Sequence, residues 1–348
     1  MDDMGAPIRA FDTAMPDLTG SSILITGGTG TFGTGFIKAV LARFRPERLV
    51  VFSRDELKQY NMQNEPEIGD HSCMRFFIGD VRDQHRLENA MRDVDYVIHA
   101  AALKQVETAE YNPFECIHTN VLGAENVVQA AIRCGVRKVI ALSTDKAANP
   151  INLYGASKLA SDKLFVAGNN MSGLVGTRFS VVRYGNVLGS RGSVVPFFRK
   201  LLANGECELP ITDTKMTRFW IPLEQGVTFV LSSLELMHGG EIFVPKIPSS
   251  DLPTLVKALA PDAQTRVVGI RPGEKLHETM ISADDARTTV DLGDRFAIKP
   301  AYRWWGDDGN RQDLRGASVP EGFVYASNQN EDYLTVGQLR ALLEMAKV

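Results

Sequence analysis

Short apolar runs rich in β-branched residues alternate with helical patterns along the first half of the chain. Each run is followed by small or polar residues, which is typical of a buried strand in a parallel sheet. We predict strands at residues 22–26, 49–52, 75–78, 96–99, 139–142 and 181–184, with helical patterns between them at 36–43 and around 112–134. This alternation predicts an α/β fold with a Rossmann-like, doubly wound parallel sheet.

A glycine-rich segment, T-G-G-T-G-T-F-G at 26–33, lies between the first strand and the first helix. Its glycines at 27, 30 and 33 allow a tight turn, close approach to a pyrophosphate, and packing of the helix on the strand. The N–H groups and the dipole at a helix N-terminus favour such an anion. We therefore expect a dinucleotide cofactor to contact Gly27, Thr29, Gly30, Thr31, Phe32 and Gly33.

The ends of the next three strands carry the other predicted cofactor contacts. Ser53 and Arg54 offer a hydroxyl and a guanidinium to a ribose 2′-phosphate, and Lys58 adds positive charge, which favours NADP. Asp55 keeps NAD as an alternative. Asp80 can bind the adenine amino group, and Lys104 can face either cofactor or substrate. Further cofactor contacts are expected at Val81, Ala100 and Ala101, although small residues there also suit helix packing.

Acidic, basic and hydroxyl side chains gather where the fifth strand gives way to a polar loop and a helix, at 141–158. Tyr154 and Lys158 are four residues apart, so a helix places them on one face, where an ammonium lowers the pKa of a phenol. Taken alone, this pair also suits a core cap and a solvated helix face. Thr144, Asp145 and Lys146 add a second acid and a second base at the edge where open α/β sheets carry chemistry. Two proton-transfer pairs in one corner indicate a multistep reaction.

The second half of the chain contains the predicted substrate contacts. Asn186 has a donor and an acceptor that suit a uracil or acetamido group, and Arg218 is expected in a polar loop flanked by aromatic residues. Arg271 and Glu274 bracket a Pro-Gly turn expected to precede another helix. Arginine suits diphosphate oxygens, and a carboxylate suits ribose hydroxyls. With Lys104 and Thr144, the predicted substrate contacts are Asn186, Val187, Arg191, Val194, Arg218, Arg271 and Glu274; Arg191 is equally compatible with a surface role.

A glycine-rich passage at 185–192 and an amphipathic helix pattern at 194–202 indicate a change of domain. We expect residues 21–186, completed by 223–250, to form the NADP-binding domain. Residues 187–222 and 251–348 are expected to form a smaller C-terminal substrate-binding domain. Residues 1–20 are expected to form an N-terminal leader.

Composition narrows the possible partners and the compartment. A formal charge of −4 argues against a nucleic-acid or anionic-membrane partner, and no run of about 18 apolar residues predicts a membrane span. The acidic N-terminus lacks the apolar core of a signal peptide. The four cysteines and the two C-terminal histidines, His238 and His277, lack metal-ligand spacing. We therefore expect a cytoplasmic protein with reduced thiols and no metal.

With T-G-x-x-G-x-x-G at 26–33 and Y-x-x-x-K at 154–158, the chain resembles the extended short-chain dehydrogenase/reductase family. F-S-R-D-E-L-K-Q at 52–59, A-A-A-L-K at 100–104 and S-T-D-K-A-A-N-P at 143–150 are similar to its configuration-inverting nucleotide-sugar 4,6-dehydratases. The same holds for R-Y-G-N-V at 183–187, M-T-R-F-W-I at 216–221 and R-P-G-E-K-L-H-E at 271–278. The resemblance covers about residues 21–282. We expect the resemblance to end there, with the leader and the tail after about residue 283 outside it.

This resemblance implies an NADP-dependent lyase acting on UDP-N-acetylglucosamine. It implies that Tyr154, assisted by Lys158, deprotonates the sugar 4-hydroxyl, that Lys146 removes the proton on carbon 5, and that Asp145 protonates the departing 6-hydroxyl. Relatives that retain configuration carry Asp-Glu at these two positions. A lysine must be neutral to act as a base, so we expect burial or nearby cations to lower the pKa of Lys146.

The resemblance further implies a homo-oligomer, a dimer or a hexamer, and the first step of pseudaminic acid biosynthesis, used in flagellin glycosylation. Two alternatives stay open. One is another NADP-dependent nucleotide-sugar dehydratase or epimerase, which Asp145 and Lys146 argue against. The other is a nonenzymatic NADP-binding regulator, which would be free to lose the proton-transfer groups that this chain keeps.

Overall fold

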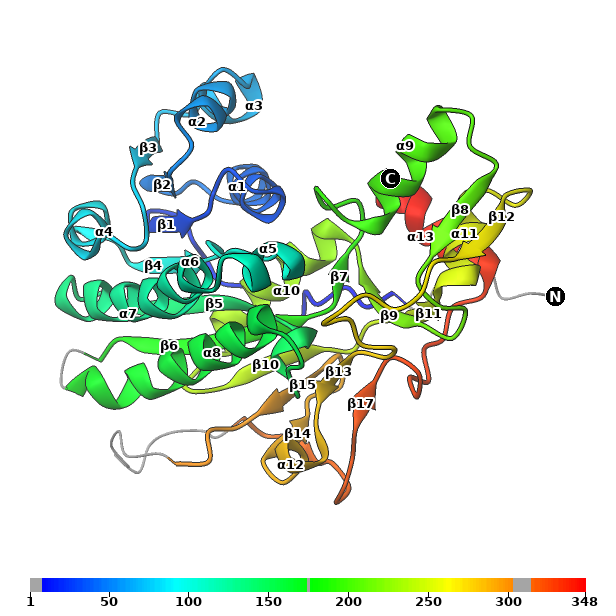
Figure 1. Cartoon of the computed structure of the whole chain (residues 1–348). Helices are drawn as coiled ribbons and strands as arrows, with labels where there is room; N and C mark the ends of the chain where they lie inside the picture. Colours follow the sequence, from blue (N-terminus) through cyan, green and yellow to red (C-terminus); the bar gives the residue numbers. More distant parts are fainter. Residues whose placement is uncertain (1–7, 174–175, 303–313) are drawn as a thin grey trace.

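The computed structural model describes residues 8–173, 176–302 and 314–348 (Figure 1). Its main feature is a sheet in the order β16-β14-β15-β10-β6-β5-β4-β1-β2-β3. The strands from β3 to β10 in this order are parallel, as the sequence predicts. They are β1 (Ser22–Thr26), β2 (Arg48–Ser53), β3 (Met74–Ile78), β4 (Tyr96–His99), β5 (Lys138–Thr144), β6 (Arg178–Tyr184) and β10 (Ile242–Pro245).

Helices cover both faces of this sheet (Figure 1). One layer contains α4 (Gln84–Met91), α7 (Gly123–Arg133) and α8 (Leu153–Met171), and the other contains α1 (Thr31–Arg43) and α10 (Leu223–Leu236). Short helices fill the connections: α2 (Glu56–Gln63), α3 (Pro66–Gly69), α5 (Val106–Tyr111) and α6 (Pro113–Ile117). The apolar strands are buried because helices lie on both sides. Among the described residues, no helix combines the length and apolarity needed to cross a membrane.

A second, smaller core lies beside the carboxyl ends of the parallel strands. It contains Trp220, Leu255 and Leu339, all at most 1% exposed. Its helices are α9 (Val194–Ala203), α11 (Leu252–Leu259) and α13 (Val336–Met345). Its strands are β7 (Asn186–Val187), β8 (Glu208–Ile211), β9 (Thr217–Ile221), β11 (Ser249–Asp251) and β12 (Gln264–Val267).

The structure differs from the expected division of the chain at both ends. Three C-terminal strands, β14 (Thr289–Asp291), β15 (Arg295–Ile298) and β16 (Ala317–Ser318), extend the main sheet in antiparallel fashion. The pair β13 (Thr279–Ile281) and β17 (Tyr325–Ala326) also contributes to the main core, and α12 (Ala283–Ala286) lies between β13 and β14. The leader is not separate either, because Phe11 and Leu18 are buried in the same core. Residues 1–7 of the predicted leader lie outside the described residues.

Three element predictions need correction. Ser143 and Thr144 belong to β5 because pairing with β6 continues to Tyr184. Arg218 lies in strand β9 and not in a loop. No helix follows Glu274 directly, since the next regular element is β13. The helical patterns predicted around 112–134 are confirmed, as α6, a π-helical turn at His118–Leu122 and α7.

Candidate active site

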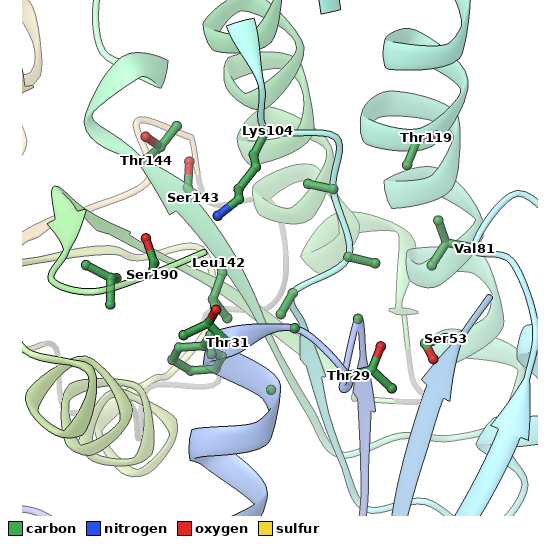
Figure 2. Close-up of a pocket in the computed structure, with 18 of the residues that line it drawn as sticks. Thr29, Thr31, Ser53, Val81, Lys104, Thr119, Leu142, Ser143, Thr144 and Ser190 are labelled. Carbon is green, nitrogen blue, oxygen red and sulfur yellow. The ribbon is translucent and has the colours of Figure 1, made fainter. Parts of the chain in front are cut away.

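A cavity of about 570 Å³ opens at the carboxyl ends of the parallel strands (Figure 2). Figure 2 shows the Lys104 side chain reaching towards the end of β5, where Leu142, Ser143 and Thr144 lie. Every residue predicted to bind the cofactor lines this cavity: Gly27, Thr29, Gly30, Thr31, Phe32, Gly33, Ser53, Arg54, Asp55, Lys58, Asp80, Val81, Ala100, Ala101, Lys104, Tyr154 and Lys158.

The glycine-rich turn leaves space that side chains would fill. Gly27 adopts a φ of +66°, and a Cβ atom there would lie 2.9 Å from the backbone of Ala101. A Cβ atom on Gly33 would lie 2.4 Å from the carbonyl oxygen of Gly28. Helix α1 begins at Thr31 with no side-chain cap, so its first N–H groups are available to a ligand. This turn fits the pyrophosphate of a dinucleotide.

The predicted ribose end of the cavity carries several charged side chains. Lys58 pairs with Asp55 at 2.5 Å, and a hydrogen bond from Lys58 lowers the pKa of that carboxyl. Arg54 Nη1 lies 3.4 Å from Asp80, which also pairs with Arg82 at 2.7 Å. Thus both nearby acids already have cationic partners, and the Arg54 side chain stays about half exposed.

The catalytic corner is built from a buried chain of charges. A short 3-10 helix, Asp145–Ala147, follows β5 directly and presents Asp145 and Lys146. The Nζ atom of Lys146 lies 3.1 Å from Asp145 Oδ1 and 3.1 Å from Glu278 Oε1. Thr144 donates to Asp145 Oδ1 at 2.9 Å. Lys146 and Thr144 line the cavity, whereas Asp145 lies behind them and is 1% exposed.

The expected lowering of the Lys146 pKa is wrong for this arrangement. Although burial opposes it, the two carboxylates of Asp145 and Glu278 raise the pKa of Lys146 above its usual value. The lysine is therefore held protonated. Burial also raises the pKa of Asp145, which is the direction that a proton donor needs.

Tyr154 lies in the first turn of α8, as expected, and lines the cavity. Burial raises the pKa of its phenol to about 12, although the charge of Lys146 and a hydrogen bond with Thr144 lower it. Burial lowers the pKa of Lys158, and Asp162 opposes that change. The simple expectation that a neighbouring lysine lowers the phenol pKa below its usual value is therefore incorrect here, because burial has the larger effect.

The residues predicted to bind substrate are divided between three places. Asn186 and Val187 line the cavity with Lys104 and Thr144. Arg191 donates to the carbonyl oxygen of Thr29 at 2.8 Å, so it lies against the glycine-rich turn and not in the smaller core. Val194 packs against the smaller core.

The remaining predicted substrate contacts lie outside the cavity lining. The guanidinium of Arg218 is buried and donates to the carbonyl oxygens of Thr217, Lys275 and Leu276. Arg271 is about half exposed and lies 3.7 Å from Glu107. The backbone N–H of Arg271 donates to Glu274 at 3.4 Å. Their Pro-Gly turn touches the start of α8, where Asn152 donates to the carbonyl oxygen of Gly273 at 2.7 Å.

Several functional candidates were absent from the predicted set. Glu278 ends the R-P-G-E-K-L-H-E segment, and its position within that motif was the available signal. Asp162 pairs with Arg183 at 3.3 Å and accepts from Ser143 at 2.9 Å behind the catalytic corner. No sequence spacing links Asp162 to Ser143 and Arg183, because the three residues lie on α8, β5 and β6 and come together only in the folded sheet.

Asn120 was expected to be hydrogen-bonded in the core or to hold a water near the catalytic loop. Its side chain bonds the backbone N–H of Leu103 at 2.8 Å and the carbonyl oxygen of the same residue at 2.9 Å. It also donates to Ser157 on α8 at 2.9 Å. Asn120 therefore ties the loop after β4 to the helix that carries Tyr154 and Lys158.

Comparison with known proteins agrees with this architecture. A family model described as "Polysaccharide biosynthesis protein" matches residues 23–300. The chain is 57% identical over 324 residues to a UDP-N-acetylglucosamine 4,6-dehydratase (inverting) of Campylobacter jejuni, covering 92% of this chain and 96% of the relative. It is also 45% identical over 291 residues to a UDP-glucose 4-epimerase of Rickettsia bellii, and that match covers 80% of this chain and 82% of the relative.

A solved structure, Pen from Bacillus thuringiensis, superimposes with a TM-score of 0.86 at 34% identity. The match covers 95% of this chain and 99% of that chain. With the glycine-rich turn and the Tyr-Lys pair placed at one cavity, the chain belongs to the polysaccharide biosynthesis protein family within the extended short-chain dehydrogenases/reductases.

Proposed function

We propose that the protein is a lyase that removes water from UDP-N-acetylglucosamine and inverts carbon 5. The product would be UDP-2-acetamido-2,6-dideoxy-β-L-arabino-hex-4-ulose. The observation that carries this proposal is the contact of Asp145 with Lys146, an acid and a base 3.1 Å apart beside Tyr154 at the cavity. The name of the Campylobacter jejuni relative, a UDP-N-acetylglucosamine 4,6-dehydratase (inverting), supports the same reaction.

NADP is the proposed cofactor, held by the glycine-rich turn and by Ser53 and Arg54. It would accept the hydride of carbon 4, later return it to carbon 6, and bring a positive charge in its oxidised form. Arg54 supports NADP over NAD because its guanidinium suits a 2′-phosphate. Asp55, the acid that would favour NAD, is paired with Lys58 at 2.5 Å.

Each proton-transfer group has a distinct task in this proposal. Tyr154 takes the proton of the sugar 4-hydroxyl, and additional positive charge counters the burial that raises the pKa of its phenol to about 12. Lys146 passes its own proton to Asp145 across their 3.1 Å contact and then takes the proton of carbon 5, which the 4-keto group has made acidic. Asp145 gives its proton to the 6-hydroxyl, which leaves as water. Carbon 5 then regains a proton on the opposite face, and this completes the inversion.

A 4-epimerase is the second candidate because the Rickettsia bellii relative carries that name. An epimerase oxidises and reduces carbon 4 and needs neither a carbon-5 base nor an acid for the 6-hydroxyl. The buried Asp145–Lys146 pair has no task in such a reaction. It therefore supports the dehydratase.

Proton NMR of the purified protein with UDP-N-acetylglucosamine in heavy water distinguishes the candidates. The dehydratase predicts a new 6-methyl signal, deuterium at carbon 5 and L-arabino couplings, without added cofactor if NADP stays bound. A 6-methyl product with D-xylo couplings would indicate a retaining enzyme. A 4-epimer that keeps its 6-hydroxyl would support the epimerase. No change after NADP is added would contradict the substrate assignment.

We also propose a homo-oligomer, and we place the reaction at the first step of pseudaminic acid biosynthesis. Large apolar side chains are exposed along α5, α6 and the π-helical turn, namely Tyr111 at 87%, Phe114 at 74% and Leu122 at 43%. Neighbouring exposed side chains of this kind suit contact with a second copy of the chain. Light scattering during size-exclusion chromatography should give at least twice the mass of one chain; a monomer would contradict this part of the proposal.

A further inference from the structure

We infer that Glu278 is a positioning residue for elimination: its carboxylate orients the Lys146 amine and keeps one proton on the Lys146–Asp145 pair. This inference rests on the proposed dehydratase function and assigns a role to a residue outside the cavity lining. Glu278 acts through Lys146 and Asp145.

The geometry gives Glu278 a fixed and buried position. Its side chain is 1% exposed, and its Oε1 atom lies 3.1 Å from Lys146 Nζ. The backbone N–H of Glu278 donates to Ser327 Oγ at 2.9 Å, and its carbonyl oxygen accepts from Ser327 N at 2.8 Å. Arg218 Nε lies 3.8 Å from the same Oε1 atom. A buried carboxylate is stable only with such partners, so this one is built into the site.

The charges of the group explain how an acid and a base can form together. In the resting arrangement, Asp145 and Glu278 are negative while Lys146 and Arg218 are positive. Transfer of one proton across the 3.1 Å contact from Lys146 to Asp145 yields a neutral amine and a carboxylic acid. Lys146 is then the base and Asp145 the acid, and the total charge is unchanged. The Glu278–Arg218 pair stays balanced throughout.

Glu278 has two effects on that transfer. Because a neutral amine still has N–H donors, it can keep its hydrogen bond to the carboxylate, which leaves its lone pair to point elsewhere. The negative charge of Glu278 also adds to the burial that raises the pKa of Asp145 and opposes the burial that lowers the pKa of Lys146, so the proton that moves between them is held within the pair. Among the described residues, Asp145 Oδ2 and Glu278 Oε2 both lack a hydrogen-bond partner. Although burial opposes it, Lys146 and Arg218 lower the pKa of Glu278, so Asp145 Oδ2 is the oxygen that carries the proton.

Other charged and titratable groups lie around Lys146 and Glu278. Tyr154 and Asp162 lie on α8, Arg218 lies on β9, and Lys275 lies three residues before Glu278 on the same segment. Lys275 donates to the carbonyl oxygen of Ala148 at 2.7 Å. Although burial opposes it, Lys146 and Arg218 lower the pKa of Glu278, so its carboxylate stays ionised. The proton of the group is therefore shared between Lys146 and Asp145.

The test is Glu278→Gln in the full-length enzyme with its cofactor. The amide keeps the size and one acceptor but removes the charge. Oxidation of carbon 4 should continue while elimination slows by about 100-fold, as for a misplaced acid–base pair. Reduced nicotinamide should then accumulate after substrate is added, measured by its near-ultraviolet absorbance. The alkaline limb of the kcat profile should move to lower pH, because the shared proton is lost more easily without the negative charge.

The matched control is Glu241→Gln. Glu241 is also a buried glutamate, but it lies outside the cavity lining, and it accepts a hydrogen bond of 2.6 Å from the Ser180 hydroxyl. It should affect stability without accumulation of reduced nicotinamide. Glu278→Asp keeps the negative charge but shortens the side chain by one methylene group, so it should give an intermediate rate of elimination. This variant also serves as the test if Glu278→Gln does not fold. A Glu278→Gln enzyme with the wild-type rate and pH profile would overturn the role of Glu278 alone. A wild-type protein that forms no 6-deoxy product would overturn the proposed function and this inference with it.

Discussion

At the scale of single residues, burial and charge act in opposite directions on the catalytic groups. Burial alone would lower the pKa of Lys146, as it does for Lys158, but two carboxylates at 3.1 Å reverse the direction. Tyr154 shows the opposite balance, since burial raises the pKa of its phenol by more than the charge of Lys146 and the Thr144 hydrogen bond lower it. The protonation state of Lys146 therefore follows from one adjacent residue, Asp145, and from one residue distant in sequence, Glu278.

Lys146→Ala is expected to abolish elimination, with a fall of about 100-fold or more, because it removes the amine that lies 3.1 Å from Asp145 at the cavity. The bound cofactor should remain, since the glycine-rich turn is untouched. Product is measured by NMR, and cofactor by absorbance after the protein is denatured. Lys163→Ala, an exposed lysine on α8, is the control and should keep full activity. Full product formation by Lys146→Ala would remove its role as a base.

Arg54→Glu is expected to weaken NADP binding more than NAD binding, by about tenfold for one lost charged contact. The reason is that a carboxylate repels a 2′-phosphate and accepts hydrogen bonds from a 2′-hydroxyl. Titration of the cofactor-free protein with each dinucleotide measures the ratio. Arg92→Glu, an exposed arginine outside the cavity lining, should leave the ratio unchanged. An unchanged preference in Arg54→Glu would contradict the ribose assignment.

At the scale of elements, the junction between β1 and α1 explains why the glycine pattern is informative. A side chain at Gly33 would meet the carbonyl oxygen of Gly28 at 2.4 Å, so this close packing depends on the absence of a Cβ atom. The π-helical turn at His118–Leu122 is a second local feature. It carries Asn120, whose amide joins the loop after β4 to α8.

Gly33→Ala should destabilise the protein by about 1–3 kcal/mol, the usual cost of overpacking, and reduce cofactor retention. Gly337→Ala is the matched control, because it also lies in the first turn of a helix but meets nothing within 4 Å. That change should be neutral or stabilise the protein by about 0.5–1 kcal/mol. Thermal unfolding of both variants, with and without cofactor, measures the difference. Equal stability of the two variants would contradict the packing argument.

At the scale of the whole molecule, both ends of the chain complete the main core. Phe11 packs edge-on against Phe229, with ring centroids 5.2 Å apart, and Arg295 from β15 lies over the Phe11 ring at 5.6 Å. These contacts join the leader, helix α10 and a C-terminal strand. The segment that carries Glu278 immediately precedes β13, so the same packing helps to place the catalytic corner.

Phe11→Ala should therefore cost about 3–5 kcal/mol of unfolding free energy, as expected for a fully buried phenylalanine. The aromatic control is Tyr60→Ala, because Tyr60 is 64% exposed on α2 and its loss should change stability by no more than about 0.5 kcal/mol. Chemical denaturation of both variants provides the comparison. A stable Phe11→Ala protein would show that the leader contributes little to the core.

The sequence by itself determined the parallel strands, the glycine-rich turn and the position of the Tyr-Lys pair. These features are local, because apolar periodicity and residue spacing report on neighbours along the chain. The tertiary structure alone decided that Glu278 and Arg218 join Lys146, that Arg191 lies on the cofactor turn, and that strands β14, β15 and β16 extend the sheet. Such contacts link segments far apart in sequence, so their effect on charge and burial depends on the complete fold.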